Sequence, residues 1–124
     1  MAEAGFTLEK KVNWPDKSVG DMSDLEKKHS PRIECPDSVK AGEAFEVRVV
    51  TGKLLEHPNE YEHFIIWSEL YADDRFLGRV TFAPVSTDPE ATFKIKLDES
   101  VNLVAYEMCN KHGLWKNVVP VEVK

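Results

Sequence analysis

The sequence predicts an all-β protein: an immunoglobulin-like sandwich of seven short antiparallel strands with an irregular N-terminal arm. Three observations lead to this prediction. Apolar and polar residues alternate with a period of two from residue 31 onward, turn-forming residues separate the alternating runs, and no long segment has the 3.6-residue period of a helix. Seven short strands without a long helix are typical of two packed antiparallel sheets.

The first element along the chain is the arm, residues 1–30, where charged and small polar residues predominate. One helical turn is expected near residues 21–28, because Ser23 followed by Glu26 has the spacing of a capping box. The sandwich is expected to occupy residues 31–124. Arm and sandwich together form one domain, since domains typically contain about 100–150 residues.

The strands follow in order, each ending at a turn signal. The run 91–97 places Ala91, Phe93 and Ile95 on one face and polar residues on the other. The run 63–72 is apolar on both faces, which predicts a central strand. The expected strands are 32–35, 44–51, 63–72, 76–83, 91–97, 101–108 and 118–123.

The composition of the 124-residue chain limits its partners. The net charge of −6 argues against nucleic acid, because phosphate binding needs a basic face. No run approaches the roughly 18 apolar residues of a membrane helix, and the N-terminus has no apolar signal core. We therefore expect a cytoplasmic protein without a membrane partner. Cys35 and Cys109 are expected to stay unpaired in that reducing compartment.

All four histidines fall within three short segments. His29 precedes the first strand, and His57 and His63 bracket a loop that enters the central strand. Cys109 and His112 follow the strand 101–108. Loops at one end of a sandwich meet in space, and imidazole and thiolate are ligands of transition metals. We therefore expect one metal ion to be bound by these five side chains.

The ligand set discriminates among metals. Structural zinc prefers four ligands with more thiolates. A cupredoxin-like copper electron-transfer protein is the alternative, because cupredoxins are β-sandwiches with a Cys and a His in a C-terminal loop. However, the weak axial Met that usually follows the His of such a copper site is absent, because Gly113-Leu114-Trp115 follows His112. Four imidazoles are also two more than that copper site uses. Iron accepts four nitrogens and one sulfur and keeps a sixth position open. A metal-free immunoglobulin-like interaction module with fortuitous histidines is a further alternative.

Three motifs carry a family resemblance. Over roughly residues 26–123 the chain resembles superoxide reductases of the one-iron, neelaredoxin type. The resemblance implies a non-haem iron with four equatorial His and one axial Cys, and often a homotetramer. It also implies one-electron reduction of superoxide to hydrogen peroxide without release of dioxygen, with electrons from rubredoxin or a similar small donor. The two-iron desulfoferrodoxin type is not expected, because no N-terminal Cys₄ iron domain is seen. The motifs are Lys28-His29-x-Pro31, His57-Pro58-Asn59-x-x-Glu62-His63 and Cys109-Asn110-x-His112-Gly113-Leu114-Trp115.

The first motif departs from the family pattern, in which Glu and Lys directly precede the first His ligand. Lys28 keeps the Lys position, but Lys27 stands where the Glu is expected, and Glu26 lies one residue further away. The resemblance implies that Lys28 attracts superoxide. It implies that Glu26 caps the sixth position of ferric iron, provided that the loop accommodates the extra residue. Because the chain is acidic, attraction of the anion must be local, and Lys27 and Lys111 are further candidates.

Overall fold

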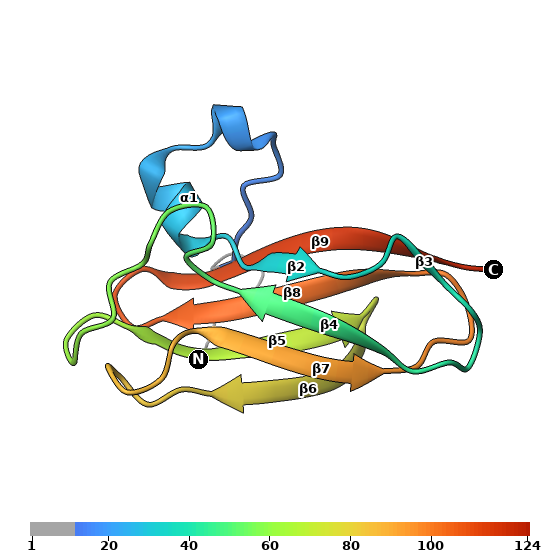
Figure 1. The fold of residues 1–124 in the computed structure, drawn as a ribbon. Helices are drawn as coiled ribbons and strands as arrows, with labels where there is room; N and C mark the ends of the chain where they lie inside the picture. Colours follow the sequence, from blue (N-terminus) through green and yellow to red (C-terminus); the bar gives the residue numbers. More distant parts are fainter. Residues whose placement is uncertain (1–11) are drawn as a thin grey trace, which may run out of the picture.

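Two β-sheets packed face to face form the body of the computed structural model, which describes residues 12–124 (Figure 1). The larger sheet has the strand order β1-β9-β8-β5-β6, with β3 added to β9, and the smaller sheet has the order β2-β4-β7. The predicted sandwich is confirmed. The elements are β1 Val12–Asn13, the 3₁₀ turn Val19–Asp21, α1 Asp24–His29, β2 Arg32–Glu34, β3 Ser38–Val39, β4 Phe45–Val50, β5 Ile65–Ala72, β6 Arg75–Thr81, β7 Glu90–Ile95, β8 Val101–Cys109 and β9 Gly113–Val123.

The structure differs from the sequence prediction around β9. All seven expected strands are present, but β1 and β3 are additional, and both pair with β9 in parallel. The expectation of wholly antiparallel pairing is therefore wrong at these two strands. Each is a two-residue segment that satisfies backbone groups along the edge of β9, and so short a segment leaves no alternation to read. In addition, β9 begins at Gly113 rather than at residue 118, because the ladder with β8 continues up to the turn.

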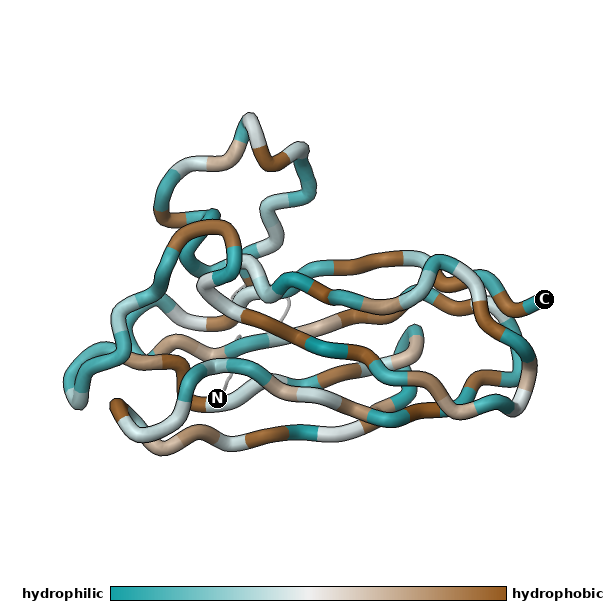
Figure 2. The backbone as a smooth tube through the Cα atoms, in the orientation of Figure 1, coloured by the Kyte–Doolittle hydropathy of each residue, from teal (hydrophilic) through white to brown (hydrophobic). Residues whose placement is uncertain are grey.

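The alternation read from the sequence fits the burial of side chains. Along β7, Ala91, Phe93 and Ile95 are buried, whereas Thr92 and Lys94 are exposed. The expected central strand, β5, lies between β8 and β6. Brown and teal residues alternate along several strands in Figure 2, which follows from the period-two geometry of a strand with one face on the core.

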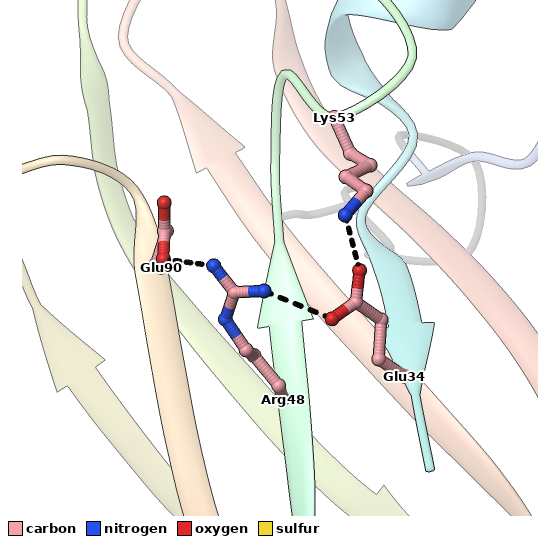
Figure 3. Close-up of polar contacts among 4 residues, drawn as sticks. All are labelled: Glu34, Arg48, Lys53 and Glu90. Carbon is pink, nitrogen blue, oxygen red and sulfur yellow. Dashed lines mark hydrogen bonds and ion pairs between the residues drawn. The ribbon is translucent and has the colours of Figure 1, made fainter.

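The outer face of the smaller sheet is polar. Arg48 on β4 donates hydrogen bonds to Glu34 on β2, at 2.9 Å, and to Glu90 on β7. The Lys53 ammonium lies 2.7 Å from Glu34. Figure 3 shows these four side chains linked across three segments of the chain. Charged side chains paired in this way keep the face compatible with water.

The outer face of the larger sheet is different in character. Aromatic and apolar side chains surround a hollow of about 710 Å³. Two cations lie over rings there: the Arg79 guanidinium is 4.3 Å from the centre of the Trp67 ring, and the Lys116 ammonium is 4.6 Å from that of Trp14. Arg79 also donates a hydrogen bond to Glu69 at 2.7 Å. Both cations therefore have partners within the described residues. Asp73 and Asp74 also line the hollow, so this face combines apolar and charged side chains.

Three connections gather at one end of the sandwich. α1, the loop over residues 51–64 and the β8–β9 turn lie together at the left of Figure 1. These are the segments that contain every histidine of the chain. Within residues 12–124, no helix has both the length and the apolar character needed to cross a membrane.

The core supports a first prediction. Leu70 on β5 is completely buried in the main apolar cluster. Leu70→Ala should lower the free energy of unfolding by about 2–5 kcal/mol, because it removes buried methyl groups and leaves a cavity. Urea denaturation followed by circular dichroism measures this change. Arg48→Ala on the polar outer face is the control and should change stability much less; equal losses in the two variants would contradict the assignment of the core.

Candidate metal centre

α1 brings His29 to the site as its last residue. The helix begins with the predicted capping box: Ser23 accepts a hydrogen bond from the Glu26 N–H at 3.2 Å, and the Glu26 carboxylate accepts one from the Ser23 N–H at 2.9 Å. Nδ1 of His29 donates to the Leu25 carbonyl at 2.8 Å. This bond selects the tautomer in which Nε2 carries a free lone pair, as a metal ligand requires.

The second segment is the loop from His57 to His63. Gly52, at φ 86°, makes room for it, because a Cβ at this position would lie 3.0 Å from the His57 backbone nitrogen. Nδ1 of His57 donates to the Pro58 carbonyl at 2.6 Å, which directs Nε2 inward. Glu60 and His63 exchange two backbone hydrogen bonds that close the loop.

The third segment is the β8–β9 turn. Cys109 ends β8 and pairs with Gly113, whose φ of 84° allows the three-residue turn to close. The His112 N–H lies 3.4 Å from the Cys109 sulfur, which can accept its hydrogen bond. Trp115 covers the site: its indole N–H donates to the His112 carbonyl at 3.1 Å, and its ring stacks on His29 with centroids 4.7 Å apart.

The four imidazoles form a closed ring. Ring centroids are 4.7 Å apart for His29 and His57, 4.8 Å for His57 and His63, 5.1 Å for His63 and His112, and 4.9 Å for His112 and His29. Cys109 adjoins this ring, with its sulfur 3.5 Å from Nε2 of His57 and 3.9 Å from Nδ1 of His112. The structure therefore brings all five predicted side chains together, and His112 is the one among them that is exposed.

The donor atoms fit a transition-metal ion. One donor atom each from His29, His57, His63 and Cys109 lie within 4.8 Å of one another. Nε2 of His63 is buried and has no hydrogen-bond partner, which is costly for a polar atom unless something binds it. Imidazole nitrogens with one thiolate are the donors that suit iron, copper and zinc.

Burial controls the protonation of the ring. It lowers the pKa of His57 from its usual 6.5 to about 4, and it also lowers the pKa of His29 and His63. These three imidazoles are therefore neutral at pH 7 and free to bind a cation. Burial raises the pKa of the Cys109 thiol, and the backbone N–H groups of Lys111 and His112 oppose this shift. A bound cation would complete the deprotonation.

Four further residues were predicted to act near the four imidazoles: Lys28, Lys111, Lys27 and Glu26. Lys28 is half-buried on α1, and its charge contributes to the lowered pKa of His29 and His63. Lys111 contributes likewise at His63. Lys27 is half-buried on α1 as well. Glu26 is held in the capping box and lies 3.1 Å from the Lys17 ammonium, and these contacts lower its pKa.

One buried residue near the site was not singled out from the sequence. Glu107 is completely buried two residues before Cys109, and neither carboxyl oxygen has a partner within the described chain. Burial raises the pKa of the Glu107 carboxyl well above its usual value. The charge of Glu107, when ionised, in turn raises the pKa of the Cys109 thiol. The available signal was the position of Glu107 two residues after Ala105 and two before Cys109, which places all three side chains on the inward face of β8.

Comparisons with known proteins bear on this site. The family model described as desulfoferrodoxin matches residues 21–118. A putative superoxide reductase of Methanocaldococcus jannaschii is 45% identical over 98 residues, which cover 76% of this chain and 82% of that protein. The neelaredoxin of Megalodesulfovibrio gigas is 37% identical over 115 residues, 78% of this chain and 88% of the relative. The solved superoxide reductase (neelaredoxin) from Ignicoccus hospitalis matches with a TM-score of 0.82 and 37% identity, covering 96% of this chain and 100% of that one.

The lowered pKa of His57 predicts how the metal-free protein responds to acid. The imidazole of His57 takes up a proton near pH 6.5 in the unfolded chain but only near pH 4 in the folded chain. The free energy of unfolding should therefore fall as the pH is lowered from about 6.5 to about 4. The loss attributable to His57 is up to about 3 kcal/mol. Urea denaturation at several pH values, with metal removed, measures it. His57→Gln should reduce the slope, and a slope equal to that of the wild type would refute the assignment.

Proposed function

The chain belongs to the desulfoferrodoxin family, and from this premise we propose that all four histidines and Cys109 bind its single iron ion. The protein is a superoxide reductase: superoxide, one electron and two protons give hydrogen peroxide, without release of dioxygen. One observation supports this function above all others. In a member of this family, a closed ring of four imidazoles adjoins one buried thiol.

The same observation weighs against the alternatives. A cupredoxin-like copper site uses two imidazoles, whereas four meet here. A structural zinc site is usually complete with four ligands, and five donors are present. An interaction module with fortuitous histidines gives no reason for gathering four imidazoles, two of them buried and one with an unpartnered buried nitrogen. The proposed ligands are His29, His57, His63, Cys109 and His112.

The protein's own groups prepare the site. When bound, iron supplies the electron and an open coordination position for superoxide. The neutral imidazoles of His29, His57 and His63 add no charge, whereas Cys109 would bind as an anionic thiolate. The His112 N–H, 3.4 Å from the sulfur, stabilises that negative charge. Trp115 packs against His29 and excludes water from that side of the ring.

Lys28 is proposed to attract superoxide and to stabilise the peroxide product by hydrogen bonding. The chain as a whole repels anions, since its net charge is −6. Lys28 directly precedes His29 and is close enough to lower the pKa of both His29 and His63. A cation at this position raises the local concentration of superoxide.

Glu26 remains a proposed ligand for the sixth position of ferric iron. Its carboxylate accepts a hydrogen bond from the Ser23 N–H and lies 3.1 Å from the Lys17 ammonium. Binding to iron would therefore require Glu26 to leave both partners, which would open the first turn of α1. Relative to the family pattern, this Glu lies one residue further from the first His. At its position here it makes these contacts with Ser23 and Lys17.

The partners and the assembly are proposals too. Rubredoxin or a similar small protein is proposed as the electron donor. Exposed Tyr61 in the ligand loop and exposed Val85 offer apolar contacts near the site. A homotetramer is proposed, and the aromatic and apolar side chains on the outer face of the larger sheet support it, since a second copy of the chain could cover them.

Location and domain limits complete the proposals. A cytoplasmic location is supported by Cys35 and Cys109, which are both free thiols and would persist in a reducing compartment. The division into an arm, residues 1–30, and a sandwich, residues 31–124, within one domain is supported by α1, which lies outside both sheets and directly precedes β2. The arm is nevertheless joined to the sandwich, because β1 pairs with β9, and residues 1–11 lie outside the described part of the chain.

The role of Cys109 predicts a change of colour. Cys109→Ser should abolish the thiolate-to-iron charge-transfer absorption of the oxidised protein while the sandwich stays folded, because a hydroxyl does not supply that transition. Visible absorption of the iron-loaded protein measures it, and circular dichroism monitors the fold. Cys35→Ser is the matched control and should keep the band. An unchanged spectrum in Cys109→Ser would exclude this residue as a ligand.

The role of Lys28 predicts a salt-dependent loss of rate. Lys28→Ala should slow the second-order reaction with superoxide by about tenfold at low salt. The difference should shrink as ionic strength rises, because the Debye length falls to about 3 Å at 1 M salt. Pulse radiolysis measures this rate. Lys27→Ala is the neighbouring control and should have a smaller effect; equal losses at all salt concentrations would argue against electrostatic attraction by Lys28.

A further inference from the structure

The side chain of Asn110 joins two of the three segments that form the metal centre. Asn110 directly follows Cys109 in the β8–β9 turn. Its Oδ1 accepts a hydrogen bond from the Phe64 N–H at 2.9 Å, and its Nδ2 donates one to the Glu62 carbonyl at 2.9 Å. The amide therefore binds the backbone on both sides of His63.

A third bond completes this contact. The Asn110 backbone N–H donates to the Phe64 carbonyl at 3.2 Å. The regular ladder between β5 and β8 ends at the pair Ile65 and Cys109, so the side-chain bonds extend the connection past the last paired residues. One hydrogen bond limits a distance, whereas three bonds to neighbouring peptide groups also limit the orientation of the loop.

His63 needs such support more than two of the other histidines. The ring of His29 is anchored through Nδ1 to the Leu25 carbonyl, and that of His57 to the Pro58 carbonyl. Within residues 12–124, the ring of His63 makes no hydrogen bond to the protein, and its Nε2 is buried without a partner. The position of this imidazole therefore depends on the backbone that carries it.

We propose that Asn110 is a positioning residue that sets the imidazole of His63 relative to the sulfur of Cys109. This inference rests on the proposed ligand set. Asn110 touches neither superoxide nor the metal and acts through His63 alone. Because groups that orient a ligand typically contribute 10–100-fold to metal affinity, its loss should be measurable without any assay of activity.

Cobalt(II) is the probe, because its absorption bands report the number and type of donors at the site. Titration of the metal-free full-length chain with cobalt(II) gives an affinity, and the thiolate-to-cobalt band reports the sulfur. Asn110→Ala should bind cobalt(II) about 10–100-fold more weakly than the wild type. Should Asn110→Ala not fold, Asn110→Asp serves in its place, since it keeps the acceptor for the Phe64 N–H. A loss of affinity in that variant is not a charge artefact, because an added carboxylate favours cation binding.

A double-mutant cycle tests whether the effect passes through His63. In the His63→Ala background, Asn110→Ala should change cobalt affinity by less than about twofold, since the positioned ligand is already absent. Ser100→Ala is the matched control, because Ser100 at the opposite end of β8 likewise accepts a backbone N–H, that of Val123 at 2.9 Å. This control should leave cobalt binding unchanged.

The outcomes separate the inference from the function on which it rests. If His63→Ala alone leaves cobalt affinity unchanged, the ligand assignment fails, and the inference fails with it. If His63→Ala weakens binding but Asn110→Ala does not, the ligand set stands and the role of Asn110 is refuted. An equal loss from Asn110→Ala in both backgrounds, or a matching loss in Ser100→Ala, would mean that Asn110 only stabilises the fold.

Discussion

Four imidazoles and a thiol gather around one point, and the architecture at this end of the sandwich disfavours charge on the two buried imidazoles, His29 and His57. Burial depresses the pKa of His57 to about 4 because a protonated ring would lose its hydration next to its neighbours. The fold meets this cost with bonds to the outer ring nitrogens of His29 and His57, which leave the inner nitrogens free. A bound cation reverses the balance, since the same lone pairs then gain a partner.

The sandwich provides the rigidity that this arrangement needs. Cys109 is the last residue of β8, which lies between β9 and β5 inside the larger sheet. The sheet therefore fixes the position of the sulfur. His112 lies in a turn closed by Gly113, and β9 continues directly from it. His29 is the last residue of α1, which lies outside the sheets. The capping box at the start of α1 stabilises the helix and thereby helps to position this proposed ligand.

Charge is distributed so that an acidic protein still attracts an anion. On the outer face of the smaller sheet, opposite charges neutralise one another among Glu34, Arg48, Lys53 and Glu90 (Figure 3). These four residues are not part of the proposed site. Near the imidazoles, Lys28 and Lys111 are the cations whose fields reach the ring. Glu107 is buried on the same strand, and burial raises its pKa, which disfavours a negative charge beside Cys109.

The sequence by itself determined the strands and the donors. Period-two alternation is a local property, so β4, β5 and β7 were readable from their own residues. The three short segments that hold the histidines and Cys109 predicted the donor set. Tertiary structure alone decided what depends on distant contacts. The parallel pairing of β1 and β3 with β9, the ion pair of Glu26 with Lys17, and the hydrogen bonds of Asn110 on both sides of His63 all join segments whose proximity no local pattern encodes. Local periodicity reports which face of an element is buried, whereas the meeting of loops follows from the way complete sheets pack.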